Sequence, residues 1–103
     1  MNKKMRDKLK EISRDYQAIK KKLDGTTQEL DTLEVKLDYL NSEEQFKLEN
    51  TPENLQNSDQ YYEREETASA LADIAASAIE LTADCSSLVD EVTDLISELD
   101  DLC

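Results

Sequence analysis

The sequence predicts an all-α fold: an antiparallel hairpin of two long heptad-patterned helices, joined by a partly helical linker and dimerising into a four-helix bundle. Three observations support this prediction. The 103-residue chain has only one Gly and one Pro, far fewer of these turn residues than an all-β chain needs. Apolar residues recur with heptad spacing along two long stretches. Residues 41–58 between them give enough chain for the second helix to fold back on the first.

The first stretch predicts one helix over residues 3–40. Its apolar steps alternate between four and three residues, with Thr26 filling the single gap. Gly25 falls at an outward c position and leaves the heptad phase unchanged, although a break over residues 24–27 is the alternative. Position a holds Leu9, Tyr16, Leu23, Leu30 and Leu37, and position d holds Met5, Ile12, Ile19, Leu33 and Leu40.

Residues 41–58 predict a linker with short helical pieces. Ser42-Glu43-Glu44-Gln45 has the spacing of a capping box, which typically begins a helix. Thr51 and Pro52 are typical of an N-cap followed by Pro at the first helical position. Ser58 is a suitable N-cap for the last long helix. Three apolar residues are expected to cover the open end of the two-helix core: Phe46, Leu48 and Leu55.

The last helix is predicted over residues 58–101, which makes the whole chain, 1–103, a single helical-hairpin domain. A second apolar row at position e makes its face wider than one partner helix covers, and this predicts a homodimer. The e row consists of Ala75, Thr82, Val89 and Ile96. The predicted self-association seam, at positions a and d, consists of Leu71, Ile74, Ala78, Leu81, Cys85, Leu88, Val92, Leu95 and Leu99, and its spacing continues to Leu102.

The charge of −13 is unevenly distributed along the chain. Residues 1–36 hold ten Lys/Arg and seven Asp/Glu, whereas residues 65–103 hold eleven Asp/Glu and no basic residue. An antiparallel hairpin would place the basic start beside the acidic end, where Asp100 and Asp101 oppose the helix dipole. The acidic end is expected to repel nucleic acid and membranes and to attract a protein with a basic surface.

The outward acids of the last helix are the candidate partner-binding residues, together with two tyrosines at its start. The acids occupy positions c and g: Asp73, Glu80, Asp94 and Asp101, and Asp84, Glu91 and Glu98. Tyr61 and Tyr62 are interpreted either as a hydrophobic staple over the linker or as an aromatic contact for a partner. Mimicry of DNA would require a dimer that places two acidic helices together. One helix carries one negative charge per ~5 Å of its axis, whereas duplex DNA carries one per ~1.7 Å.

The sequence contains few residues or motifs that could carry out catalysis or bind a cofactor. The chain has no His, which excludes imidazole bases, His metal ligands and Ser-His or Cys-His pairs. It has no Cys-x-x-Cys spacing, phosphate loop or EF-hand loop. Two cysteines, Cys85 and Cys103, are too few for a disulfide scaffold. We therefore expect a non-enzymatic protein with no metal or other cofactor.

The linker resembles a family of small phage and prophage helical proteins. Residues 46–58 read FKLENTPENLQNS and precede an Ala- and acid-rich helix, whereas the linker of those proteins reads roughly F-x-x-L-P-E-x-L-Q-x-S. Thr51 stands where that pattern has Leu. The resemblance covers about half the chain and implies an origin in a mobile element. The Trp-x-Gly turn of WXG100-type secreted hairpins, which have a similar length, is absent because the chain has no Trp.

Two functions follow from these features as hypotheses. The first is a small acidic protein of phage or mobile-element origin that blocks a host protein, for example one that binds nucleic acid. The second is a structural or adaptor coiled coil whose self-association is its function. No apolar run approaches the ~18 residues of a membrane span, and residues 1–8 lead into no apolar segment, so a cytoplasmic location is expected, in the host if phage-encoded.

Overall fold

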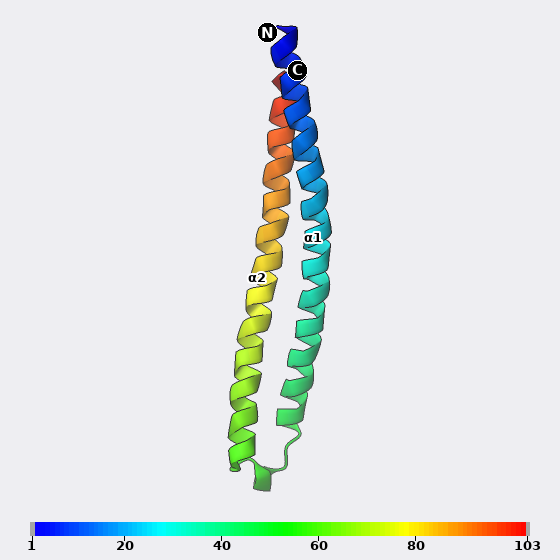
Figure 1. The fold of residues 1–103 in the computed structure, drawn as a ribbon. Coiled ribbons are helices and arrows are strands. Elements are labelled where there is room, and N and C mark those ends of the chain that lie inside the picture. Colours follow the sequence, from blue (N-terminus) through cyan, green and yellow to red (C-terminus); the bar gives the residue numbers. More distant parts are fainter. Residues whose placement is uncertain (1, 103) are drawn as a thin grey trace. The chain divides into compact units, whose positions relative to one another are not determined.

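The computed structural model describes residues 2–102 and has three helical elements (Figure 1). They are α1 (Lys3–Glu49), the short 3₁₀ helix η1 (Glu53–Leu55) and α2 (Asp59–Leu102). Residues 2–102 contain no strand. The predicted all-α class with two long helices is confirmed.

Helix α1 is longer than the sequence predicted. It passes through Gly25 without a break, and it continues beyond Leu40 to Glu49. The capping-box pattern at residues 42–45 lies inside this helix and starts no separate one. The physical reason is that good helix formers fill these positions and no Gly or Pro interrupts them before Pro52.

Side chains of the linker end α1. The Asn50 side chain donates to the carbonyl of Phe46 at 2.8 Å, and the Thr51 hydroxyl donates to that of Lys47 at 2.9 Å. Both carbonyls belong to the last turn, where helices commonly lack backbone donors, and that of Phe46 also accepts from the backbone N–H of Asn50 at 3.1 Å. Thr51 therefore caps the end of α1, and the short helical turn predicted after it is η1, whose N-cap is Pro52 and not Thr51. Pro52 then favours an extended backbone at the preceding residue.

Ser58 begins α2, as predicted. Its hydroxyl oxygen accepts a hydrogen bond of 3.2 Å from the backbone N–H of Tyr61, which is the N-cap geometry. The same hydroxyl donates to the carbonyl of Leu55 at 2.8 Å, which ties the cap to η1. Asp59 lies in the first turn, where the helix dipole favours a negative charge.

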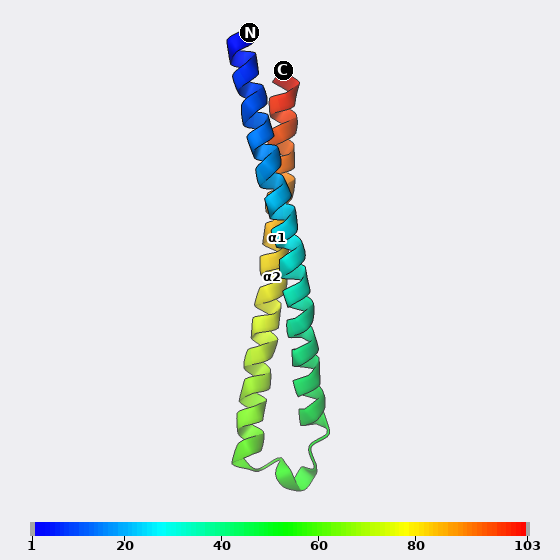
Figure 2. The same cartoon turned by 45° about the vertical axis from the view of Figure 1, so that its right-hand side comes forward.

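The chain forms two compact units, each built from a segment of α1 and a segment of α2. Unit 1 comprises Met1–Glu29 and Ala83–Cys103, and unit 2 comprises Leu30–Thr82. In each unit the two helical segments lie side by side and antiparallel, as both views show (Figures 1 and 2). Unit 2 is a hairpin in the strict sense, because it contains the linker. The single domain expected from the sequence stays a prediction.

In unit 2 the helices meet through small and polar groups near the linker. Ala68 and Ala75 of α2 are buried, and Ala68 is only 1% exposed. Gln45 of α1 donates to the Ala68 carbonyl at 3.4 Å, and Glu44 forms an ion pair of 3.4 Å with Arg64. Buried alanines allow the two backbones to come close. Of the three residues expected to cover this end, Leu48 is buried, whereas Phe46 and Leu55 are exposed.

In unit 1 the helical segments are joined by two polar contacts. The Ser13 hydroxyl donates to Asp100 at 2.7 Å, and Thr27 Oγ1 lies 3.1 Å from the Cys85 sulfur. Ser13 is only 3% exposed, so a polar side chain is buried at this contact. These contacts set the register of α1 against α2 in unit 1.

The helices face each other through positions a and e, and their d rows remain in solvent. On α1 the a-position leucines and Tyr16 are half-buried, and the e row supplies polar residues such as Ser13 and Thr27. On α2 the a row (Leu71, Ala78, Cys85, Val92 and Leu99) and the e row (Ala75, Thr82, Val89 and Ile96) are buried or half-buried. The large d-position residues are exposed: Met5, Ile12, Ile19, Leu33 and Leu40 of α1, and Ile74, Leu81, Leu88, Leu95 and Leu102 of α2.

Candidate interaction surfaces

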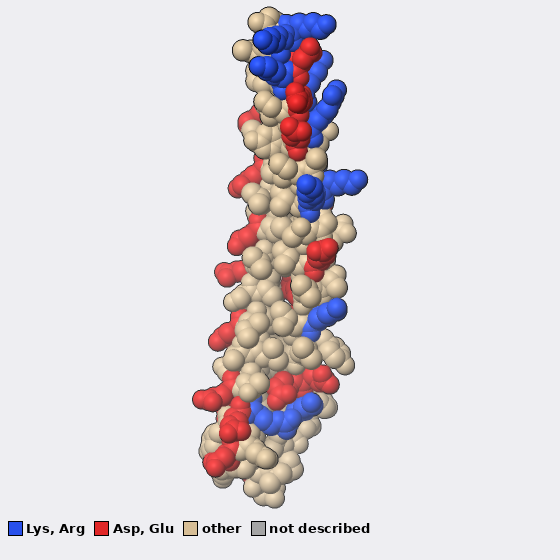
Figure 3. Space-filling model, in the orientation of Figure 1, with Lys and Arg blue, Asp and Glu red and all other residues tan. Residues whose placement is uncertain are grey.

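The outward acids of α2 form the first candidate surface. Asp73 and Glu80 lie in unit 2, and Asp84, Glu91, Asp94, Glu98 and Asp101 lie in unit 1. All seven are exposed, and acidic side chains follow one edge of α2 in the space-filling view (Figure 3). These carboxylates are therefore accessible to a partner.

The basic residues of α1 lie in the same unit as the acidic end of α2. Residues 1–29 hold nine Lys/Arg and five Asp/Glu, and residues 83–103 hold seven Asp/Glu and no basic residue. Since the segments are antiparallel and Ser13 contacts Asp100, the basic start lies along the acidic end, as expected. Asp100 nevertheless accepts its hydrogen bond from the hydroxyl of Ser13, whereas the sequence suggested a basic neighbour.

The nine residues of the predicted self-association seam divide into two groups. Leu71, Ala78, Cys85, Val92 and Leu99 are half-buried on the face that meets α1. Ile74, Leu81, Leu88 and Leu95 are exposed, with exposed fractions between 37% for Leu95 and 56% for Leu81. The difference arises because α1 packs against the a and e rows of α2, so the d row lies outside this contact.

The exposed d rows of both helices lie on one side of each unit. Around an α-helix, position e lies about 40° to one side of a, and position d about 60° to the other. Since the helices are antiparallel and meet through a and e, both d rows turn to the same side. We call this the d face. In unit 1 it consists of Met5, Ile12, Ile19, Leu88, Leu95 and Leu102, and in unit 2 of Leu33, Leu40, Ile74 and Leu81.

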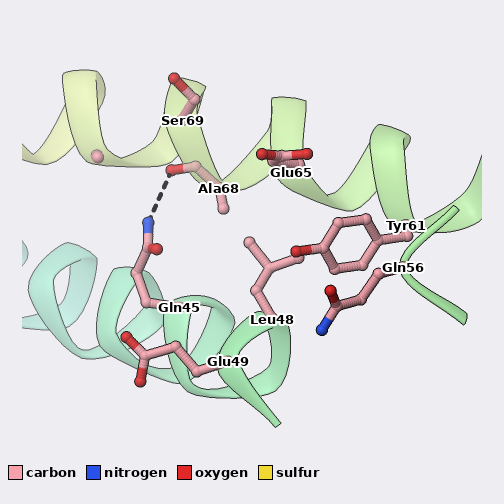
Figure 4. A pocket seen from close by; sticks show the side chains of 9 residues that line it. Gln45, Leu48, Glu49, Gln56, Tyr61, Glu65, Ala68 and Ser69 are labelled. Atoms are coloured by element: carbon pink, nitrogen blue, oxygen red, sulfur yellow. Dashed lines mark hydrogen bonds between the residues drawn. The ribbon is translucent and has the colours of Figure 1, made fainter. Parts of the chain in front are cut away.

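Tyr61 and Tyr62 play different roles at the start of α2. Their rings form an edge-to-face pair with centroids 6.2 Å apart. Tyr61 is half-buried and faces Leu48, which agrees with the staple interpretation (Figure 4). Tyr62 is 52% exposed, so only this ring is open to a partner.

A shallow hollow of about 510 Å³ lies between the helices of unit 2, beside the linker (Figure 4). Sequence reasoning missed it, because its lining comes from three segments that meet only in the folded unit. Its polar lining includes the side chains of Gln45, Glu49, Gln56 and Glu65, and Leu48 and Tyr61 also line it. Gln45 is engaged with the Ala68 carbonyl, and Gln56 donates to the Thr51 carbonyl at 3.1 Å. Gln45 thus joins α1 to α2, and Gln56 joins two residues of the linker.

The described residues offer little to a metal ion or a redox reaction. Residues 2–102 contain no group of His, Cys, Asp and Glu that is arranged to hold a metal. Cys85 is a free, half-buried thiol beside Thr27, where it packs between the helices. Cys103 lies outside the described residues. None of the described helices has the length and apolar character needed to cross a membrane.

Comparisons with protein-family models, with curated proteins and with solved structures give no match. The two candidate surfaces, the outward acids of α2 and the d face, are therefore judged by their chemistry alone.

Proposed function

We propose that the chain is a non-enzymatic interaction protein that binds a partner protein with a basic surface through the outward acids of α2. The observation that supports this proposal is the exposure of all seven acids along a helix whose last 38 residues contain no basic side chain. Exposed carboxylates of one sign attract a cationic surface over several ångströms and accelerate its encounter. They contribute little to the stability of the fold itself.

The resemblance of residues 46–58 to phage and prophage proteins supports a more specific role. A protein of mobile-element origin that acts in the host cytoplasm gains from blocking a host protein, and host nucleic-acid-binding proteins carry basic surfaces. An assembly that brings two acidic helices together would approach the charge density of DNA more closely than one helix does. We therefore favour a blocking protein that competes with nucleic acid, and no direct binding of nucleic acid or membrane.

A structural or adaptor role is the second candidate, and the d face favours it. Ten large apolar side chains at d positions are exposed on the described chain. Monomeric proteins rarely leave large apolar patches open to water. Self-association of d faces into a four-helix bundle would cover them, and assembly alone would then be the function.

Affinity capture from a candidate host lysate at two salt concentrations separates the two roles. The blocking role predicts capture of a DNA- or RNA-binding protein that is lost as salt rises, because salt screens exposed charges. The structural role predicts recovery of the chain itself, unaffected by salt. Capture of no basic protein at low salt would contradict the blocking role.

A further inference from the structure

We propose that the d face of unit 1 binds the same face of a second copy, with α2 of each copy lying on α1 of the other. This inference deepens the dimer suggested above and rests on it. Three features of this face favour the contact: its extent, its heptad spacing and the charges beside it.

The d face of unit 1 is large enough for a specific contact. It carries Met5, Ile12, Ile19, Leu88, Leu95 and Leu102, with exposed fractions between 37% and 60%. Six such side chains, about half exposed, present on the order of 500 Å² of apolar surface, which matches the largest patch of a typical monomer. Two copies together would bury on the order of 1,000 Å², the lower bound for a biological interface.

The spacing of the face makes a second copy the best-fitting occupant. Its side chains stand at heptad intervals on two antiparallel helical segments. Knobs-into-holes packing requires a partner with the same repeat, so that each side chain enters a space between four others. A second copy presents that repeat, and a two-fold axis brings identical patches together.

Charge selects how the two copies are arranged. The g row beside the d face carries only acids on α2 (Asp84, Glu91 and Glu98), whereas on α1 it carries two lysines and two acids (Lys8, Lys22, Asp15 and Glu29). Placing α2 on α2 of the second copy would oppose acids with acids along the whole row. Placing α2 on α1 instead brings the segment of residues 83–103, which has no basic residue, against residues 1–29, which hold nine. Like charges across an interface are the main means of rejecting a wrong pairing.

One charge pair reports on this arrangement. Within a copy, Lys22 and Glu91 both lie between the Ser13–Asp100 and Thr27–Cys85 contacts. The two residues are therefore at nearly the same level along the helix axes. Both occupy g positions, which turn away from the a/e contact of their own copy. In the proposed dimer, Lys22 of one copy faces Glu91 of the second. The c row of α2, including Asp94 and Asp101, stays outside this contact and remains available to a basic partner.

Analytical ultracentrifugation of the purified chain, without any partner, tests the contact. The parent is expected to sediment as a dimer, and the variant L88Q/L95Q as a monomer with unchanged helical circular dichroism. The matched control is V35Q/I79Q, which changes two apolar residues that lie outside the d rows and are more exposed than Leu88 and Leu95, and it should remain dimeric. A monomeric parent, or an L88Q/L95Q variant as dimeric as the parent, would overturn the contact.

Charge exchange tests the arrangement. K22E and E91K alone should each weaken the dimer about tenfold, since each leaves like charges at two symmetry-related places. The double variant K22E/E91K should return to near the parent dissociation constant. A double variant as weak as the single ones would overturn the placement of α2 on α1. These measurements contain no partner protein, so their failure leaves the capture of a basic partner standing, and the reverse also holds.

Discussion

The hydroxyl of Ser13 donates a hydrogen bond of 2.7 Å to a carboxylate oxygen of Asp100, and it joins α1 to the last turn of α2. Gln17 donates to the same hydroxyl oxygen at 3.4 Å. A negative charge near a helix C-terminus opposes the helix dipole, and α2 has no basic residue in its last turn. Ser13 therefore donates a hydrogen bond to the Asp100 carboxylate, whose charge is unfavourable at the C-terminus of α2.

Replacing Ser13 with Ala should lower the free energy of unfolding by about 1 kcal/mol, because Asp100 loses its donor at a part-buried position. Urea denaturation followed by circular dichroism measures this change. Ser87→Ala, at an exposed position on α2, is the matched control and should change stability by less than about 0.5 kcal/mol. Equal stability of S13A and S87A would mean that the hydrogen bond contributes nothing.

Ala68 tests the close approach of the helices in unit 2. Its side chain is buried and its carbonyl accepts from Gln45, so Ala68→Leu has no space to occupy. We expect a loss of about 1–3 kcal/mol from overpacking. Ala70→Leu adds the same atoms at an exposed position of the same helix and should leave stability nearly unchanged. If both variants unfold at the same denaturant concentration as the parent, the helices do not meet at Ala68.

Gly25 tests the continuity of α1. A side chain added there meets nothing within 4 Å, and Gly costs about 0.5–1 kcal/mol relative to Ala inside a helix. Gly25→Ala should therefore raise the melting temperature. Gly25→Pro should lower it sharply, because Pro removes a backbone donor and clashes with the preceding turn. A G25A variant that melts below the parent would indicate a break in the helix at this residue.

Much of the fold is predictable from local chemistry. The phase of the heptads across Gly25 indicates a single first helix, and the hydroxyl of Ser58 identifies the start of α2. The end of α1 was predicted too early, because Ser42-Glu43-Glu44-Gln45 suits a helix interior as well as a helix start. The true end depends on Asn50 and Thr51, whose side chains bond back to carbonyls of the last turn.

The orientation of the helical faces could not be read from the apolar pattern. A heptad shows that positions a and d are apolar, but each helix can turn either its d row or its e row toward its neighbour. The choice depends on which residues of α2 the e row of α1 meets: Ser13 contacts Asp100, and Thr27 contacts Cys85. Such pairs join residues from opposite ends of the chain, and no local signal indicates them. The e-row residue Asn41 even keeps a buried side-chain oxygen without a partner.

The candidate surfaces were predicted to different degrees. The outward position of the acids follows from the heptad alone, and all seven are exposed. The separation of Ile74, Leu81, Leu88 and Leu95 from the contact between helices required the structure. The hollow beside Gln45 and Gln56 also required it, because three separate segments form its walls.

The most direct test of partner binding is a charge reversal on the c row of α2. A variant with Asp73, Glu80 and Asp94 changed to Lys should keep its helicity, since all three side chains are exposed. Its matched control reverses Asp7, Asp15 and Glu29 on α1, which are also exposed and give the same net charge. Titration calorimetry with the captured basic partner should show a steep loss of affinity at low salt for the c-row variant and near-parent affinity for the control. Equal binding by the c-row variant and the parent would contradict the account, because the acids of α2 would then be only a solvated surface.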